Sequence, residues 1–275
     1  MIDCLYRRLP ADGEFLGAPP TRRVGGLFES TDGTRSNWDP EIQHGSPPLA
    51  LMTKLIEELA GGSGLRVGRL TLDILGAIPV TPVRVRAWVA RPGARISIMA
   101  AEMLAPRPDG SERAVARVTA WLLATSDTAD AVTDRYPPLV EGNSLAVPHN
   151  WEGAPGYLET VSWRRQKTAE GESSEVWLSP LVPLVDSEPT TELQRLAMVV
   201  DSANGAGAAL DPEKFVFMNT DTVVHLHRLP AGNDFGLRAR GSIGPDGIGV
   251  TTADIFDRQG FIGVVAQTLL VQRRP

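Results

Sequence analysis

Three polar residues in the second half of the chain stand in apolar surroundings and could act together on one substrate. Asp201 falls in the middle of an expected helix, residues 192–210, with apolar residues on its N-terminal side. Asn219 and Gln267 lie in two expected strands that are otherwise largely apolar. Asp is a poor helix-interior residue, and an unpaired amide in an apolar strand is costly. We expect the three side chains to converge on one site, where the carboxylate accepts a proton and the amides fix positions.

A second group of residues lies at the start of the first expected helix. His44, Gly45 and Ser46 precede two prolines, which suit the first turn of a helix. Free backbone N–H groups at a helix N-terminus are suited to an oxyanion, so the amides of Gly45 and Ser46 could complement Asp201. A plain helix start explains the same pattern equally well. His44 is a candidate base, and a loop histidine with a structural hydrogen bond is the simpler interpretation.

These residues are positioned by two similar sets of elements. The first half reads as a short strand at 24–29, a helix at 49–60, and strands at 66–78, 81–91, 94–104 and 112–124. The second half reads as strands at 157–166 and 174–181, the helix at 192–210, and strands at 215–228, 235–242, 247–256 and 261–271. The separators are short and rich in Pro and Gly, which predicts antiparallel hairpins.

The repeated order indicates an internal duplication of about 150 residues, hence two domains rather than a solenoid unit. A helix followed by a long antiparallel sheet suggests a sheet wrapped round one central helix, and two such sheets can join edge to edge. We therefore predict an α+β tandem, or double, hotdog with one continuous sheet. Its expected parts are an N-terminal hotdog at 1–125, a linker at 126–156 and a C-terminal hotdog at 157–275.

The polar set is expected in the second half only. Gln267 falls opposite Ala120, Asp201 falls near Leu55, and Asn219 falls near Leu70 when the halves are aligned by eye. This difference is expected if one copy kept a site and the other kept only its packing role.

Bulk properties narrow the class of protein. The net charge of −6 argues against a general nucleic-acid binder, and no apolar run approaches the ~20 residues of a membrane span. The single cysteine, Cys4, excludes an intrachain disulfide and suits a reducing cytoplasm, which is the expected location. His225 and His227 alternate on one strand, a spacing that can bind a metal. No Cys or carboxylate cluster accompanies them, so we expect neither metal nor cofactor.

The chain resembles the TesB-like acyl-CoA thioesterases (thioesterase II), and more closely their actinobacterial branch. The resemblance covers roughly residues 20 to 273, in family order and spacing. The motifs that carry it are NWDP at 37–40 with QHGSPP at 43–48, DSANG at 201–205, NTDTVVHLHR at 219–228 and AQTLL at 266–270.

The resemblance implies a double hotdog that hydrolyses acyl-CoA thioesters at an Asp, a Ser or Thr, and a Gln that together position water. Those roles would fall on Asp201, Asn219 and Gln267, where Asn219 replaces the usual hydroxyl residue. The expected partner is an acyl-CoA substrate, with the acyl chain in an apolar tunnel lined by residues such as Met198. The oligomeric state is left open, and a homodimer of double hotdogs is one arrangement.

Two other functions remain as alternatives. The first is a hotdog enoyl-CoA hydratase or dehydratase. That chemistry requires an Asp–His pair, and only His44 could supply the histidine. The second is a non-catalytic acyl-CoA or lipid-binding protein that has kept the cavity. No G-x-S-x-G segment occurs, which disfavours a serine-hydrolase elbow.

Overall fold

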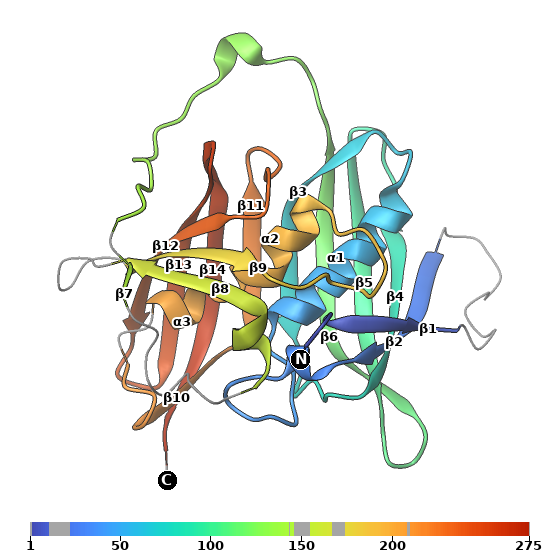
Figure 1. Ribbon diagram of the computed structural model, residues 1–275. Helices are drawn as coiled ribbons and strands as arrows, with labels where there is room; N and C mark the ends of the chain where they lie inside the picture. Colours follow the sequence, from blue (N-terminus) through green and yellow to red (C-terminus); the bar gives the residue numbers. More distant parts are fainter. Residues whose placement is uncertain are drawn as a thin grey trace.

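The computed structural model describes residues 2–10, 23–142, 144–145, 155–166, 174–207 and 210–274. Part of the expected linker, residues 143 and 146–154, therefore lies outside the described residues. In the described part of the chain, 14 strands form one sheet, and the helices lie against one of its faces (Figure 1).

The first half contains six strands and one long helix. The strands are β1 (Tyr6–Leu9), β2 (Arg23–Ser30), β3 (Leu65–Ile74), β4 (Pro82–Arg91), β5 (Ile96–Pro106) and β6 (Glu112–Ala124). The helix α1 (Ser46–Ala60) carries prolines in its first turn and ends at Gly61, as its sequence predicts. Short 3-10 turns, η1 (Asp32–Thr34) and η2 (Ala129–Ala131), lie before the helix and after β6.

The second half contains eight strands and two short helices. The strands are β7 (Ser144–Leu145), β8 (Val161–Gln166), β9 (Ser174–Pro180), β10 (Phe215–Asn219), β11 (Asp221–Leu226), β12 (Phe235–Ile243), β13 (Ile248–Asp257) and β14 (Gly260–Arg273). The helices are α2 (Glu192–Val200) and α3 (Ala203–Gly207), and the 3-10 turn η4 (Tyr157–Thr160) precedes β8. Residues 157–160 were expected to be extended and are not.

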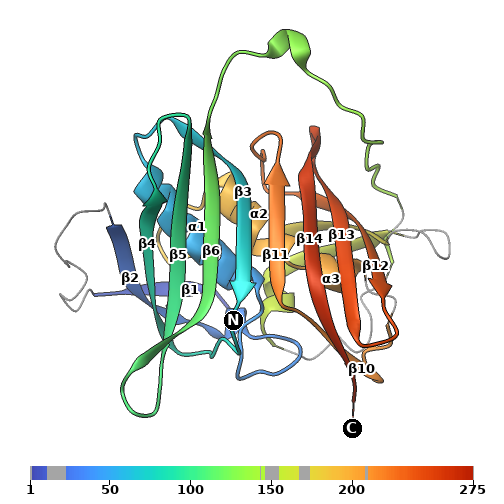
Figure 2. The ribbon, with the colours of Figure 1, turned by 180° about the vertical axis from the view of Figure 1, so that it is seen from behind.

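The two halves join along β3 and β11, which pair antiparallel at the centre of the sheet (Figure 2). The strand order is β1-β2-β4-β5-β6-β3-β11-β14-β13-β12-β9-β8-β7, and β10 pairs with β14 beside this path. Two similar antiparallel sheets thus become one, each holding a helix against its inner face. The predicted double hotdog is confirmed.

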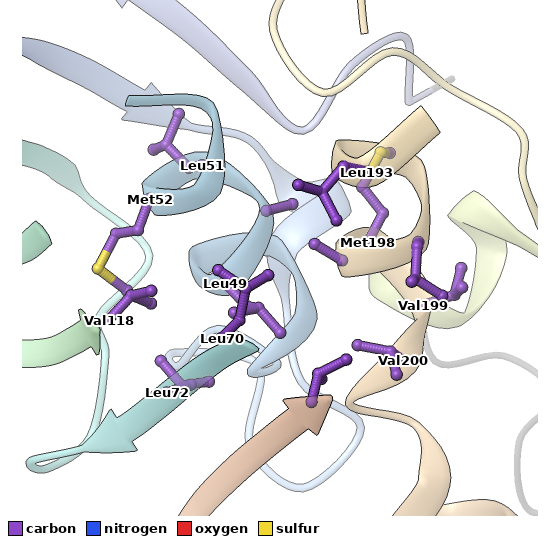
Figure 3. Packing of buried hydrophobic residues seen from close by; sticks show 14 of the residues in the cluster. Leu49, Leu51, Met52, Leu70, Leu72, Val118, Leu193, Met198, Val199 and Val200 are labelled. Carbon is purple, nitrogen blue, oxygen red and sulfur yellow. The ribbon is translucent and has the colours of Figure 1, made fainter. Parts of the chain in front are cut away.

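One large apolar core fills the space between the sheet and the helices. It includes Leu49 and Met52 of α1, Val118 of β6, and Leu193 and Val199 of α2, all of them buried (Figure 3). The two helices also contact each other. Because the core is shared, the relative position of α1 and α2 is held by packing from both halves.

Two of the predicted elements are broken where the polar residues lie. The expected helix 192–210 stops at Val200 and resumes at Ala203, so Asp201 caps the end of α2 rather than lying mid-helix. The Ser202 N–H bonds to the Val199 carbonyl at 3.1 Å, a tight 3-10-type closure of the last turn. Asp disfavours the helix interior because its short polar side chain competes for backbone partners.

The expected strand 215–228 is also divided, between β10 and β11. Asn219 lies opposite Leu269 of β14, and Val223 lies opposite Ala266. Four steps along one strand therefore face three steps along the other, which is the geometry of a β-bulge. Such an extra residue changes which side chains point to the core.

Candidate active site

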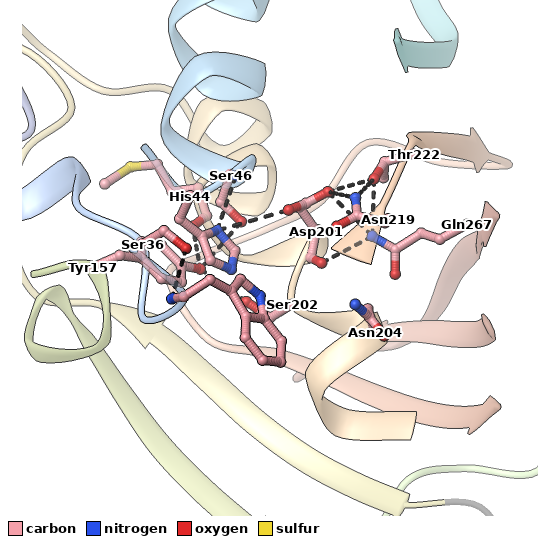
Figure 4. A network of polar contacts seen from close by, with 12 residues as sticks. Ser36, His44, Ser46, Tyr157, Asp201, Ser202, Asn204, Asn219, Thr222 and Gln267 are labelled. Atoms are coloured by element: carbon pink, nitrogen blue, oxygen red, sulfur yellow. Dashed lines mark hydrogen bonds and ion pairs between the residues drawn. The ribbon is translucent and has the colours of Figure 1, made fainter. Parts of the chain in front are cut away.

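Asp201 is the centre of a buried polar network between the two helices and the sheet (Figure 4). The break between α2 and α3 turns its side chain toward β11 and β14, and the residue is 2% exposed. The structure brings it together with both of the predicted partners. Asn219 Nδ2 donates to Asp201 Oδ1 at 2.8 Å, and Gln267 Nε2 donates to the same oxygen at 3.1 Å.

A fourth residue, Thr222, belongs to this network and was missed from the sequence. Its hydroxyl donates to Asp201 Oδ1 and lies 2.9 Å from Gln267 Nε2 and 3.2 Å from Asn219 Nδ2. A regular strand with Asn219 facing inward would point Thr222 outward. The bulge between β10 and β11 reverses this, so that Thr222 is fully buried.

The two carboxylate oxygens of Asp201 have different surroundings. Three donors converge on Oδ1 and occupy its positions for accepting hydrogen bonds. Oδ2 accepts no hydrogen bond from any described residue, and its neighbour is Gly45 at the start of α1. A Cβ on Gly45 would lie only 2.5 Å from Oδ2, so only glycine permits this approach.

His44 lies beside the carboxylate but does not bond to it. Its Nδ1 is 3.7 Å from Asp201 Oδ2, and the same nitrogen accepts the Ser46 N–H at 3.1 Å. Burial lowers the pKa of His44, while the negative charge of Asp201 acts in the opposite direction. The ring is therefore a neutral imidazole whose Nδ1 is an acceptor, and its contact with Oδ2 is not an ion pair.

Tyr157 holds the start of α1 against the end of α2. Its ring stacks on His44 with centroids 3.9 Å apart, and its hydroxyl donates to the Met198 carbonyl at 2.9 Å. The Tyr157 hydroxyl oxygen also lies 3.2 Å from Ser46 Oγ and 2.9 Å from Ser202 Oγ. Burial raises the pKa of Tyr157, so the hydroxyl stays protonated and available as a donor.

The start of α1 offers one free amide rather than several. Pro47 and Pro48 have no N–H, and the Ser46 N–H is already donated to His44. Among the described residues, the Gly45 N–H has no acceptor, while the Gly45 carbonyl accepts from Leu49 at 3.1 Å. Of the two amides considered from the sequence, Gly45 is the one left to face a ligand.

A cavity of about 320 Å³ opens beside Asp201 and Gly45. Apolar side chains from both halves form much of its wall, including Trp38, Ile74, Ile78, Leu158, Trp163 and Met218. Asn219 and His44 also reach it, whereas Gln267 and Thr222 lie behind Asp201. Met198 was expected in the acyl tunnel but is buried in the core, so the wall methionine is Met218.

Other candidates from the sequence lie away from this cavity. His225 and His227 are exposed on β11 and beside it, and the described residues contain no group of three or more side chains arranged to hold a metal. Three arginines of the sheet, Arg84, Arg86 and Arg238, each form an ion pair with a glutamate of the sheet. Among the described helices, none is long and apolar enough to cross a bilayer.

The fold and the position of the site define the class as a double-hotdog protein, and comparison with known proteins agrees. Similar solved structures include a tesB protein of Mycobacterium avium subs paratuberculosis (14% identity, 91% of this chain and 93% of that chain, TM-score 0.63). They also include the acyl-CoA thioesterase II TesB2 of Mycobacterium marinum (14% identity, 90% of this chain and 92% of that chain, TM-score 0.63). A third is a hotdog-fold protein of unknown function from Alicyclobacillus acidocaldarius (15% identity, 97% of this chain and 95% of that chain, TM-score 0.65). At these identities the likeness establishes the fold alone.

Sequence profiles identify the family. The profile of the acyl-CoA thioesterase N-terminal domain matches residues 34–123, and that of the C-terminal domain matches residues 133–271. A search of curated proteins found no match. The chain belongs to the acyl-CoA thioesterase family, and the protein is a thioesterase.

Proposed function

We propose that the protein hydrolyses acyl-CoA thioesters to a free fatty acid and CoA by direct attack of water at Asp201. The observation that carries this proposal is the difference between the surroundings of the two carboxylate oxygens of Asp201. Oδ1 is held by three donors, whereas Oδ2 accepts no hydrogen bond from a described residue, and Asp201 and Gly45 both line the cavity. A fixed carboxylate with one free oxygen is suited to hold and deprotonate a water molecule.

The reaction then follows from the positions of these groups. A water bound to Oδ2 attacks the thioester carbonyl carbon and gives a proton to Asp201. The carbonyl oxygen becomes an oxyanion, which the Gly45 N–H at the start of α1 can stabilise. When the tetrahedral intermediate collapses, the C–S bond breaks, and the CoA thiolate takes the proton from Asp201. Asn219 and Gln267 keep the carboxylate in place throughout.

The acyl chain is assigned to the apolar wall of the cavity. The wall is built by Trp38 and Ile78 from the first half and by Trp163 and Met218 from the second. This apolar lining favours an apolar acyl chain over a charged one, because the wall has few hydrogen-bonding or charged partners for a buried charge.

The surroundings of His44 disfavour the hydratase alternative. An Asp–His pair needs a proton shared between the two side chains. Here Nδ1 of His44 accepts the Ser46 N–H, and a second acceptor, Asp201 Oδ2, lies 3.7 Å from it. The ring is instead stacked on Tyr157, which suits a residue that shapes the site.

A thiol-release assay over a panel of acyl-CoAs tests the proposal. We expect saturable release of CoA thiol with stoichiometric free acid from at least one acyl chain. Hydration of an enoyl-CoA without thiol release would favour the hydratase. If no thiol is released but acyl-CoA raises the thermal midpoint, the protein is an acyl-CoA binder and the proposal fails.

A further inference from the structure

The cavity beside Asp201 has no positive charge of its own to meet the phosphate groups of CoA. Among the described residues that line it, none is a lysine or an arginine, and burial lowers the pKa of His44. The chain as a whole carries a net charge of −6, so no general field attracts an anion. A carrier with phosphate groups must therefore meet its cation at the rim of the cavity.

Arg113 lies at this rim, near the start of β6. Its Nη2 donates to the Ala77 carbonyl at 3.1 Å, and its Nη1 lies 3.0 Å from the position that a Cβ on Gly76 would take. Gly76 and Ala77 both line the cavity. Because Gly76 has no side chain, the guanidinium of Arg113 can lie directly against the cavity wall.

The guanidinium of Arg113 has donors left for a ligand. Its one hydrogen bond to a described residue is the bond to Ala77, which uses only part of the N–H groups of an arginine. No described carboxylate forms an ion pair with it, because the adjacent Glu112 is paired with Arg84 at 2.8 Å. The planar fork of an arginine matches two oxygens of a phosphate group, so Arg113 is free to bind one.

The distance from the proposed oxyanion site to Arg113 suits CoA. The Gln43 N–H donates to the Ile78 carbonyl at 2.7 Å, which joins the segment before α1 to the segment after β3. Gly45 follows Gln43 by two residues, and Ala77 directly precedes Ile78. Along this path, the Gly45 N–H and the Arg113 guanidinium are at most roughly 17 Å apart. The pantetheine arm of CoA has about 13 bonds from sulfur to the first phosphorus, as many as about four residues of backbone, and extends to about 15 Å.

We propose that Arg113 binds the pyrophosphate of the CoA carrier at the rim of the cavity, and that the protein thereby selects CoA thioesters over thioesters whose carrier has no phosphate. The inference rests on the proposed function for the identity of its ligand. The thioester lies between Asp201 and Gly45, the pantetheine arm runs along residues 76–78, and the guanidinium donates to the pyrophosphate oxygens. Arg113 touches neither the attacking water nor the thioester, so it acts on substrate binding.

The test uses two substrates that differ only beyond the pantetheine arm: the acyl-CoA that wild type cleaves fastest, and the acyl-pantetheine with the same acyl chain. We expect Arg113→Gln to lower kcat/KM for the acyl-CoA about tenfold, mainly through KM, as for the loss of one charged hydrogen-bond donor. The ratio of kcat/KM for acyl-CoA to kcat/KM for acyl-pantetheine should fall by the same factor. Arg113→Lys keeps the charge without the planar fork, so its ratio should lie between wild type and Arg113→Gln.

Arg91→Gln is the matched control. The Nη1 of Arg91 donates to the Ile96 carbonyl at 3.0 Å, and Arg91, like Arg113, forms no ion pair with a described residue. Neither Arg91 nor Ile96 lines the cavity, so this variant should keep the wild-type ratio.

Arg274 is the competing cation. Its Cζ lies 6.0 Å from the centroid of the Trp38 ring, which also lines the cavity. A fall of the ratio in Arg274→Gln without a fall in Arg113→Gln would overturn the inference and place the phosphates beside Trp38.

A purely structural role of Arg113 gives a different result. Loss of its bond to Ala77 would then lower kcat/KM for both substrates equally and leave their ratio unchanged. That outcome would overturn the inference while the hydrolysis proposal stands.

Thermal unfolding with CoA and with pantetheine, neither of which has an acyl group, separates the opposite case. At equal concentrations, CoA should raise the thermal midpoint of wild type more than pantetheine does, and Arg113→Gln should remove this difference. If wild type releases no thiol from any acyl-CoA but shows this difference, the hydrolysis proposal fails and the phosphate site stands. If wild type shows neither thiol release nor the difference, both fail.

Discussion

Replacing Gly45 by Ala should disable the site through one added carbon atom. The ideal Cβ would lie 2.5 Å from Asp201 Oδ2, 2.9 Å from Cγ and 3.1 Å from Oδ1. An ordinary contact is at least 3.4 Å, so the carboxylate and the helix start must separate by 3.4 − 2.5, or about 0.9 Å. A displacement of about 1 Å in a reacting group can cost about 100-fold in rate, equivalent to about 2.7 kcal/mol in activation free energy.

The backbone itself gives no reason for such a loss. Gly45 has φ −68° and ψ −27°, a right-handed helical conformation that alanine adopts readily. The effect should therefore fall on kcat in the thiol-release assay. Gly61→Ala, at the other end of α1, is the matched control, because its Cβ would meet only ordinary contacts. Wild-type kcat in Gly45→Ala would refute the placement of Asp201 Oδ2 as the reacting atom.

Two further predictions concern stability. Tyr157→Phe should lower the free energy of unfolding by about 1 to 3 kcal/mol in urea titrations, because the buried Met198 carbonyl loses its donor. Below about pH 6.5, the unfolded chain binds a proton at His44 that the folded protein binds less readily, since burial lowers the pKa of His44 in the fold. The free energy of unfolding should therefore fall as the pH drops through that window, with a steeper slope in wild type than in His44→Gln. Equal slopes would contradict a buried neutral ring.

The fold could be predicted because its signals are local. Alternating strands, short separators with Pro or Gly, and one helix in each half repeat along the chain. Hairpins leave few choices of topology, and two open edges at β3 and β11 can be satisfied by pairing with each other. The convergence of Asp201, Asn219 and Gln267 was expected because each is a polar residue in apolar surroundings, and it agrees with the observed contacts.

The details of the site could not be read from the pattern, because they depend on two breaks. The bulge after Asn219 places Thr222 on the inner face, and strand alternation alone assigns it to the outer one. The end of α2 at Val200 frees Asp201 to turn toward the sheet, and a continuous helix would have held it elsewhere. The use of the Ser46 N–H by His44 also depends on side-chain packing that no periodicity records.

The central claim is tested most directly by Asp201→Asn. The new amide can keep its oxygen at the three donors, which puts an NH₂ group where Oδ2 now faces the cavity. An NH₂ group cannot take a proton from water, so we expect kcat for thiol release to fall about 10²- to 10⁴-fold while acyl-CoA still raises the thermal midpoint. Hydrolysis of every acyl-CoA at the wild-type rate would show that Asp201 is not the catalytic carboxylate.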